Sequence, residues 1–138
     1  VSIWYYDNGW NFSIFNTSFK SKAQIKAIEP GFGYWIKMLS DSMLTITGKA
    51  LTNSSMSLNS GWNLIGHKSI EAKSISAIIK PISDQIISIW GYDNQRKQWQ
   101  QYMINGSSRI NNLEMLEPGK GYWFNVKDEC ILDFNIEK

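Results

Sequence analysis

An internal repeat is the feature that most constrains how this chain folds. Residues 117–126 (EPGKGYWFNV) repeat residues 29–38 (EPGFGYWIKM), and residues 88–94 (SIWGYDN) repeat residues 2–8 (SIWYYDN). After residue 94 the second copy has the longer loop, which marks a hairpin tip because loops accept insertions. The repeat is too long for a solenoid unit, so it predicts two domain-sized modules or one pseudo-symmetric domain.

Each copy predicts an antiparallel hairpin, then a turn, then another strand. Asp7, Asn8 and Gly9 lie between aromatic runs, and Asn and Gly tolerate the left-handed backbone that a two-residue hairpin turn needs. In the Glu-Pro-Gly turn, Pro fixes φ and Gly accepts a positive φ. The aromatic and aliphatic residues after this turn favour a strand.

Alternation along the strand after the turn separates two faces. In the first copy we expect Tyr34, Ile36 and Met38 on the core face, and Trp35 and Lys37 on the other face. The second copy repeats this with Tyr122, Phe124 and Val126 on the core face and Trp123 and Asn125 opposite. Each half should end in a fourth strand, with apolar positions at Leu44 and Ile46 and at Leu132, Phe134 and Ile136.

The segment between the two copies predicts a linker, a strand and a helix. Residues 49–57 are small and polar, as is typical of a linker, and residues 58–66 predict one further strand. Residues 69–80 carry apolar side chains at helical spacing, and Pro81 should end this short amphipathic helix. The strand and the helix have no counterpart in the first half, so we expect the first repeat to lack its opening portion.

These patterns together predict a mainly β fold. We expect a duplicated antiparallel β unit, sandwich-like or barrel-like, with one short amphipathic helix in the second half. The domains would be a first repeat at 1–48, a linker at 49–57 and a complete second repeat at 58–138, or one pseudo-symmetric domain overall. The sheets should pack through Trp and Tyr side chains.

The composition favours a folded domain and disfavours several partners. Electrostatic binding of nucleic acid needs clustered basic residues, whereas the 14 Lys and Arg are scattered and the net charge is only +2. No apolar segment is long enough to span a membrane. The lone Cys130 excludes an intrachain disulfide and a Cys-x-x-Cys metal site, and its alternating apolar surroundings predict a buried thiol. Because the sequence begins at Val1 without a signal-like segment, we expect a piece of a longer parent chain.

Three motifs in order give a resemblance to a known kind of module. They are Gly61–Gly66 (GWNLIG), residues 88–93 (SIWGYD) and residues 117–123 (EPGKGYW). With these motifs the chain resembles a tandem repeat module found near the ends of large secreted bacterial surface proteins. The resemblance implies an extracellular or cell-surface accessory role beside adhesin-like, carbohydrate-active or peptidase-bearing parents. It supplies no catalytic residues.

The seven Trp residues have two interpretations. Each belongs to the repeat pattern, which favours a packing role, because burying one aromatic side chain stabilises a fold by about 4–6 kcal/mol before entropy is included. The alternative is a carbohydrate-binding role for Trp35 and Trp123, which share a face with Lys37 and Asn125. Exposed coplanar rings beside polar groups would favour glycan stacking, and complete burial would favour packing.

The polar motifs favour structural roles. Asp7-Asn8 and Asp93-Asn94 lack the further carboxylates of a calcium loop, so turn chemistry is the better interpretation. Glu29 and Glu117 occupy equivalent turns, and the single His67, expected to be solvated, cannot form a multi-histidine metal site. An enzyme with a site across both halves would need a deep pocket that holds Glu29 or Glu117 near His67.

The sequence therefore predicts a non-catalytic accessory or interaction module, without cofactor or metal, of an exported bacterial surface protein. A carbohydrate-binding module is the alternative. The expected partner is a glycan or another surface protein.

Overall fold

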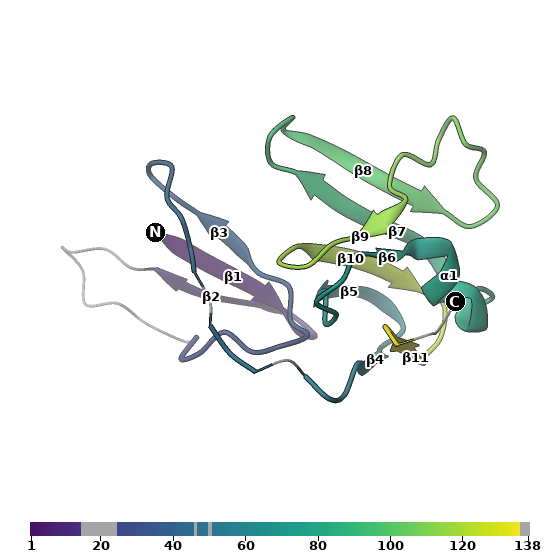
Figure 1. Cartoon of the computed structure of the whole chain (residues 1–138), viewed down its shortest axis with the longest axis horizontal. Helices are drawn as coiled ribbons and strands as arrows, with labels where there is room; N and C mark the ends of the chain where they lie inside the picture. Colours follow the sequence, from purple (N-terminus) through teal and green to yellow (C-terminus); the bar gives the residue numbers. More distant parts are fainter. Residues whose placement is uncertain (15–24, 46, 50, 136–138) are drawn as a thin grey trace.

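Two antiparallel sheets, one from each repeat, form most of the fold (Figure 1). The computed structural model describes residues 1–14, 25–45, 47–49 and 51–135. The first sheet has the strand order β2-β1-β3, from β1 (Ser2–Tyr6), β2 (Trp10–Ile14) and β3 (Trp35–Lys37). The second has the order β5-β10-β7-β8, from β5 (Gly61–Gly66), β7 (Ile86–Asp93), β8 (Gln98–Met103) and β10 (Gly121–Val126). The predicted mainly β class is confirmed.

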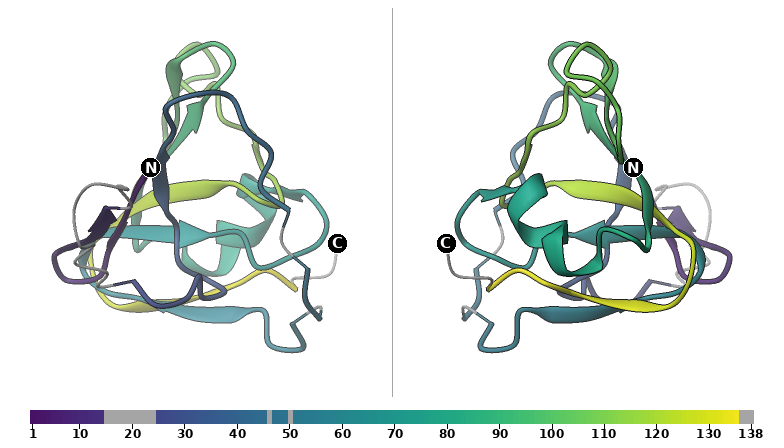
Figure 2. Two further views of the ribbon diagram at one scale, coloured as in Figure 1. Left: turned by 90° about the vertical axis from the view of Figure 1, so that its left-hand side faces the viewer. Right: turned by 90° about the vertical axis from the view of Figure 1, so that its right-hand side faces the viewer.

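Two small sheets and a short helix complete the second repeat. β4 (Ser55–Leu58) pairs with β11 (Cys130–Asp133), and β6 (Lys73–Ser74) pairs with β9 (Met115–Leu116). The helix α1 (Ile75–Ile79) continues into a 3-10 turn, η1 (Lys80–Ile82). Figures 1 and 2 show α1 on the side of the four-stranded sheet that faces away from the first repeat.

The strand register shows that the repeat in sequence is also a repeat in structure. Trp4 lies opposite Trp35 in the first sheet, and the equivalent Trp90 lies opposite Trp123 in the second. The hairpins match as well, since β1 pairs with β2 as β7 pairs with β8. The β2-β1-β3 sheet therefore corresponds to β8-β7-β10, and β5 has no counterpart among the residues of the first repeat that the structure describes.

The Glu-Pro-Gly turn has the same conformation in both copies. Gly31 and Gly119 adopt φ values of +90° and +76°, which glycine tolerates better than other residues. The Tyr34 hydroxyl accepts the backbone N–H of Glu29 at 3.0 Å, and the Tyr122 hydroxyl accepts that of Glu117 at 2.9 Å. The two glutamates thus occupy equivalent turns.

The hydrophobic core belongs to the second repeat. Phe124 and Val126, predicted on the core face, are 0% and 1% exposed. The same core includes Leu58, the three isoleucines of α1, and Leu132 and Phe134 near the C-terminus. Helix α1 and strand β11 cover this face, so its apolar side chains and the ring of Tyr122 are buried.

The core face predicted for the first repeat is not buried. Ile36, Met38 and Leu44 are 37%, 44% and 63% exposed, whereas their equivalents Phe124, Val126 and Leu132 are almost fully buried. The predicted fourth strand is also absent, because residues 41–45 are irregular; Ile46 and Ile136 lie outside the described residues. In the second repeat β4 pairs with β11, and the first repeat has no described equivalent of β4.

Three further boundaries differ from the sequence predictions. The predicted strand 58–66 is two strands, β4 and β5, and β4 begins inside the segment expected as a linker. Helix α1 is shorter than the predicted 69–80, because β6 takes up residues 73–74. The first hairpin has a three-residue loop, since Tyr6 pairs with Trp10, with Asn8 in left-handed conformation at φ +50°.

The turn of the first repeat docks directly on β5 of the second. Phe32 forms a β-bridge with Ile65, and the N–H of Gly66 donates to the Gly31 carbonyl at 2.9 Å. The N–H of Gly33 also donates to the Leu64 carbonyl at 3.2 Å. Backbone pairing therefore joins the two repeats.

Gly66→Ala should weaken this junction, because a Cβ at Gly66 would lie 2.5 Å from the Phe32 carbonyl oxygen. We expect a loss of about 1–3 kcal/mol in the free energy of unfolding, measured by urea denaturation. Gly48→Ala is the matched control, since a Cβ there meets nothing within 4 Å. Equal stability of the two variants would mean that the docked turn moves aside without cost.

Candidate functional site

All seven Trp residues line an open apolar groove between the two sheets, which we call the tryptophan groove. It consists of two adjoining hollows of about 450 and 590 Å³ that share Trp10, Trp99 and Trp123. The other lining residues are Trp4, Tyr6, Phe12, Trp35, Trp62 and Trp90. Every lining side chain is aromatic, so the groove favours ligands that present apolar or flat surfaces.

Trp123 is the centre of one half of the groove. Its ring lies 5.4 Å from Tyr6, 5.7 Å from Trp10 and 6.1 Å from Trp62, measured between ring centroids. Tyr6 and Trp10 come from the hairpin of the first repeat, and Trp62 comes from β5. The hairpin of the first repeat therefore packs on the PGxGYW tryptophan of the second.

The other half of the groove repeats this arrangement with the roles exchanged. Trp35 of the first repeat lies 5.6 Å from both Tyr92 and Trp99 of the second hairpin. The groove is thus an approximately two-fold symmetric contact in which each hairpin packs on the other repeat's tryptophan. Trp35 has no partner equivalent to Trp62, because the first repeat has no described counterpart of β5.

The tryptophans pack between the two sheets, as expected, but they do not form the hydrophobic core, which corrects the expectation that their rings are buried in the interior. Trp10, Trp62 and Trp99 are 55%, 46% and 47% exposed, and the other four are half-buried. The physical reason is alternation, since Tyr122, Phe124 and Val126 lie on the covered face of the second sheet and the Trp residues project from the opposite face. The rings are also not coplanar, because Trp123 meets its three neighbours at 57° to 86°.

The structure brings together only part of the predicted site. Trp35 and Trp123 both line the tryptophan groove, where they share the hollow of about 590 Å³. Lys37 is exposed opposite Ser2, and Asn125 lies opposite Trp62 and Ser88; neither lines the groove. Ligand binding by these four residues stays a prediction.

Sequence reasoning missed the most exposed rings of the groove. Trp10 and Trp99 are equivalent residues at the start of each return strand, and each pairs with a Tyr across the hairpin. Trp62 is the second residue of β5, the strand that has no described first-half counterpart. The sequence repeat shows that Trp10 and Trp99 are equivalent positions. Strand alternation alone, however, does not show which faces of the two sheets lie opposite each other, so it could not place these rings in one groove.

A polar cleft of about 360 Å³ adjoins the groove beside Trp62 and Tyr6. Asp7 and Asn8 of the first hairpin face residues of β4 and β5 across it. Several of its polar groups already have structural partners: the Asn63 side chain bonds to the backbone of Asn59, and Lys68 donates to the Ser55 carbonyl at 2.7 Å. The Asn8 side chain donates to the Asp7 carboxylate at 3.4 Å, and because both side chains are exposed, their further donor and acceptor capacity can meet a ligand.

The predicted turn chemistry accounts for the Asp residue of the second hairpin. The Asp93 carboxylate accepts the backbone N–H groups of Arg96 and Gln95 at 3.1 and 2.9 Å, and these bonds lower its pKa. At the other turn, Glu117 forms an ion pair with Lys120, which raises the pKa of the lysine. Within the described residues, no group of three or more His, Cys, Asp and Glu side chains is placed to hold a metal ion.

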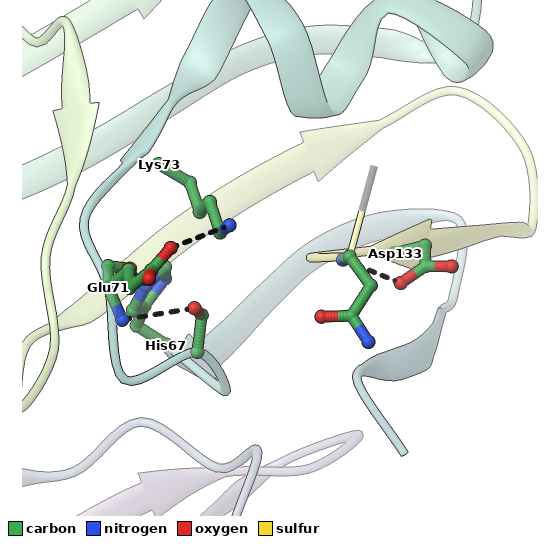
Figure 3. A network of polar contacts seen from close by, with 6 residues as sticks. His67, Glu71, Lys73 and Asp133 are labelled. Carbon is green, nitrogen blue, oxygen red and sulfur yellow. Dashed lines mark hydrogen bonds and ion pairs between the residues drawn. The ribbon is translucent and has the colours of Figure 1, made fainter. Parts of the chain in front are cut away.

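His67 lies beside Glu71 and Lys73, away from the tryptophan groove (Figure 3). It is half-buried, not solvated as predicted, and its ring stands edge-on to Phe134 at 4.9 Å. Its Nε2 atom contacts the Glu71 carbonyl at 2.7 Å, and its Nδ1 atom is buried without a hydrogen-bond partner among the described residues. Cys130 is likewise only partly buried, and burial raises its pKa.

Protonation of His67 should destabilise the fold. Burial lowers the pKa of His67, and the Lys73 charge acts in the same direction, while the contact with the Glu71 carbonyl opposes it. The unfolded state, with a His pKa of about 6.5, therefore binds more protons just below that pH, so the free energy of unfolding falls as pH drops. Urea denaturation between pH 7 and 5 should show a smaller fall for His67→Gln, and identical falls would contradict the prediction.

Comparison with known proteins gives no assignment: no family model, curated protein or solved structure matches the chain. None of the described helices is long and apolar enough to cross a membrane.

Proposed function

We propose that this chain is a non-catalytic binding module of an exported bacterial surface protein, acting outside the cell or at its surface. The observation that carries the proposal is the tryptophan groove, where seven Trp side chains remain partly exposed. Exposed apolar surface of this kind is typical of interaction sites. The resemblance of the three repeat motifs to tandem modules of secreted surface proteins supports the location.

The groove itself favours an apolar segment of another surface protein as ligand. All its lining residues are aromatic, and Tyr and Trp are enriched where protein interfaces form because they supply large contact areas. The edge-to-face arrangement of the rings leaves hollows between them, not one flat platform. Such hollows suit side chains inserted one at a time.

The second candidate function is carbohydrate binding, and the polar cleft beside Trp62 favours it. There the half-exposed Trp62 lines the same cleft as Asp7 and Asn8 of the first hairpin. A sugar could stack on the ring and form hydrogen bonds with the hairpin tip. This site differs from the predicted one, because its polar groups are not Lys37 and Asn125.

One titration series tests both ligand classes. Trp fluorescence would be followed while soluble oligosaccharides, and separately peptides rich in aromatic residues, are added to the chain. Saturable binding that weakens at least tenfold in Trp62→Ala places the binding surface around Trp62, which lines both the tryptophan groove and the polar cleft, and the ligand that binds identifies the class. Ile131→Ala is the control, because Ile131 is 63% exposed on β11 and lines neither hollow. Binding that Trp62→Ala leaves unchanged would contradict the assignment.

A further inference from the structure

The equivalent strands β3 and β10 differ in their pairing, because within the described residues only β10 is paired on both edges. β10 lies between β5 and β7, while β3 pairs with β1. Among the described residues, no strand pairs with the outer edge of β3. An open edge of this kind presents unpaired N–H and C=O groups and is a template for another strand.

The direction of the open groups follows from the repeat. The His67 N–H donates to the Lys120 carbonyl, so these two residues form a hydrogen-bonded pair at the end of the ladder between β5 and β10. Such pairs recur at every second residue of an antiparallel ladder, so Tyr122, Phe124 and Val126 direct their backbone N–H groups toward β5. The equivalent residues of the first repeat are Tyr34, Ile36 and Met38. Their N–H groups therefore point to the open edge.

The face beside this edge is apolar and uncovered. Ile36 and Met38 are 37% and 44% exposed, whereas Phe124 and Val126 are buried with α1 and β11 in the core. In the second repeat, the segment that pairs with the equivalent edge also supplies the helix that covers the equivalent face. One segment that contains a strand and a helix would therefore pair with the open edge of β3 and cover the exposed side chains of Ile36 and Met38.

Residues of the second repeat already lie opposite the open edge of β3. In the cleft beside β5, the hairpin residues Tyr6 to Asn8 and the turn 30–32 of the first repeat face the outer side of that strand. The equivalent hairpin residues Tyr92 and Asn94 and the turn 119–121 border a cleft of about 240 Å³ together with Tyr34 to Ile36. Figure 1 shows the β7-β8 hairpin tip and the turn before β10 directed toward β3.

We propose that the outer edge of β3 is a docking site for a strand–helix segment of the same type as residues 55–82, supplied by another copy of the repeat. The docked strand lies antiparallel to β3, with its leucine opposite Trp35, as Leu64 lies opposite Trp123. Its tryptophan stands beside Trp35 and Trp99 and completes the two-fold arrangement of the groove. This inference does not depend on which ligand the tryptophan groove binds.

The test places a second copy of residues 51–86 directly before Val1 of the full chain, which reproduces the natural spacing because Ser2 is equivalent to Ser88. Hydrogen exchange measured by NMR should slow at least tenfold at the amides of Ile36 and Met38. Exchange at Phe124 and Val126, already paired with β5, is the internal reference that the second repeat is folded.

The matched control carries Asp in the added copy at the position equivalent to Ile65, a residue that is 3% exposed in the core. Amide protection at Ile36 and Met38 should disappear in this control. Protection in a monomer or in a strand-exchanged dimer supports the proposal. Unchanged exchange at Ile36 and Met38 in the extended chain, with Phe124 still protected, overturns it.

Discussion

Replacing Phe124 by Ala is expected to lower the free energy of unfolding by about 3–5 kcal/mol. Phe124 is fully buried in the core of the second repeat, so the substitution leaves a cavity under α1 and β11. The equivalent Ile36→Ala should cost only about 1 kcal/mol, because Ile36 is already 37% exposed and little apolar surface leaves water there on folding. Urea denaturation followed by far-ultraviolet circular dichroism measures both.

This pair of variants tests where the stability of the chain resides. The two positions have the same strand register, since Ile36 lies opposite Ile3 as Phe124 lies opposite Ile89. A difference in effect therefore reports burial and not local strand geometry. Comparable losses in the two variants would mean that the Ile36 face is covered in solution, and would contradict the exposed face described above.

The repeat made much of the fold predictable from sequence. Two copies of a hairpin and a PGxGYW strand must form equivalent pairs, and the opposition of Trp4 to Trp35 and of Trp90 to Trp123 confirms the predicted duplicated unit. Alternation also assigned the correct faces, since Trp123 and Phe124 project from opposite sides of β10. Local pattern is sufficient for these features because strand alternation has a fixed period of two.

The burial of each face could not be predicted in the same way. Whether Ile36 or Phe124 is buried depends on a helix that lies far away in sequence, and within the described part of the chain that helix belongs to the second repeat alone. The Trp residues were expected in the interior because of their size. Their exposure follows from how the two sheets face each other, and this arrangement depends on the Phe32 bridge to β5, which no spacing in the sequence indicates.

The length of the ordered elements was also set by tertiary partners. The fourth strand expected at Leu44 and Ile46 matches β11 in sequence pattern, but β11 is held by its pairing with β4. Residues 41–45 have no such partner among the described residues and are irregular. Propensity therefore predicted a strand at Leu132 correctly, although this strand ends at Asp133 before the predicted position Phe134, and it predicted a strand at Leu44 incorrectly.

Replacing Trp123 by Ala should loosen the attachment of the first repeat to the second. Trp123 contacts Tyr6, Trp10 and Trp62, and aromatic pairs of this kind contribute about 0.5–1.5 kcal/mol each beyond their area burial. We expect a loss of about 3 kcal/mol in the free energy of unfolding, against about 1 kcal/mol for Trp62→Ala, whose ring contacts Trp123 from the rim of the groove. Chemical denaturation followed by fluorescence gives both values.

The location of the loosening distinguishes an inter-repeat contact from general destabilisation. In Trp123→Ala, hydrogen exchange should accelerate in β1 and β2 more than in β7, because the first hairpin packs on the removed ring while β7 keeps both of its strand neighbours. Trp10→Ala should lower the free energy of unfolding less in the Trp123→Ala background than in the unchanged chain, because the two rings contact each other. Strictly additive losses of stability would show that the two rings act independently. Uniform acceleration of exchange in both sheets would show general destabilisation. Either result would mean that the packing of each hairpin on the other repeat's tryptophan does not hold the repeats together.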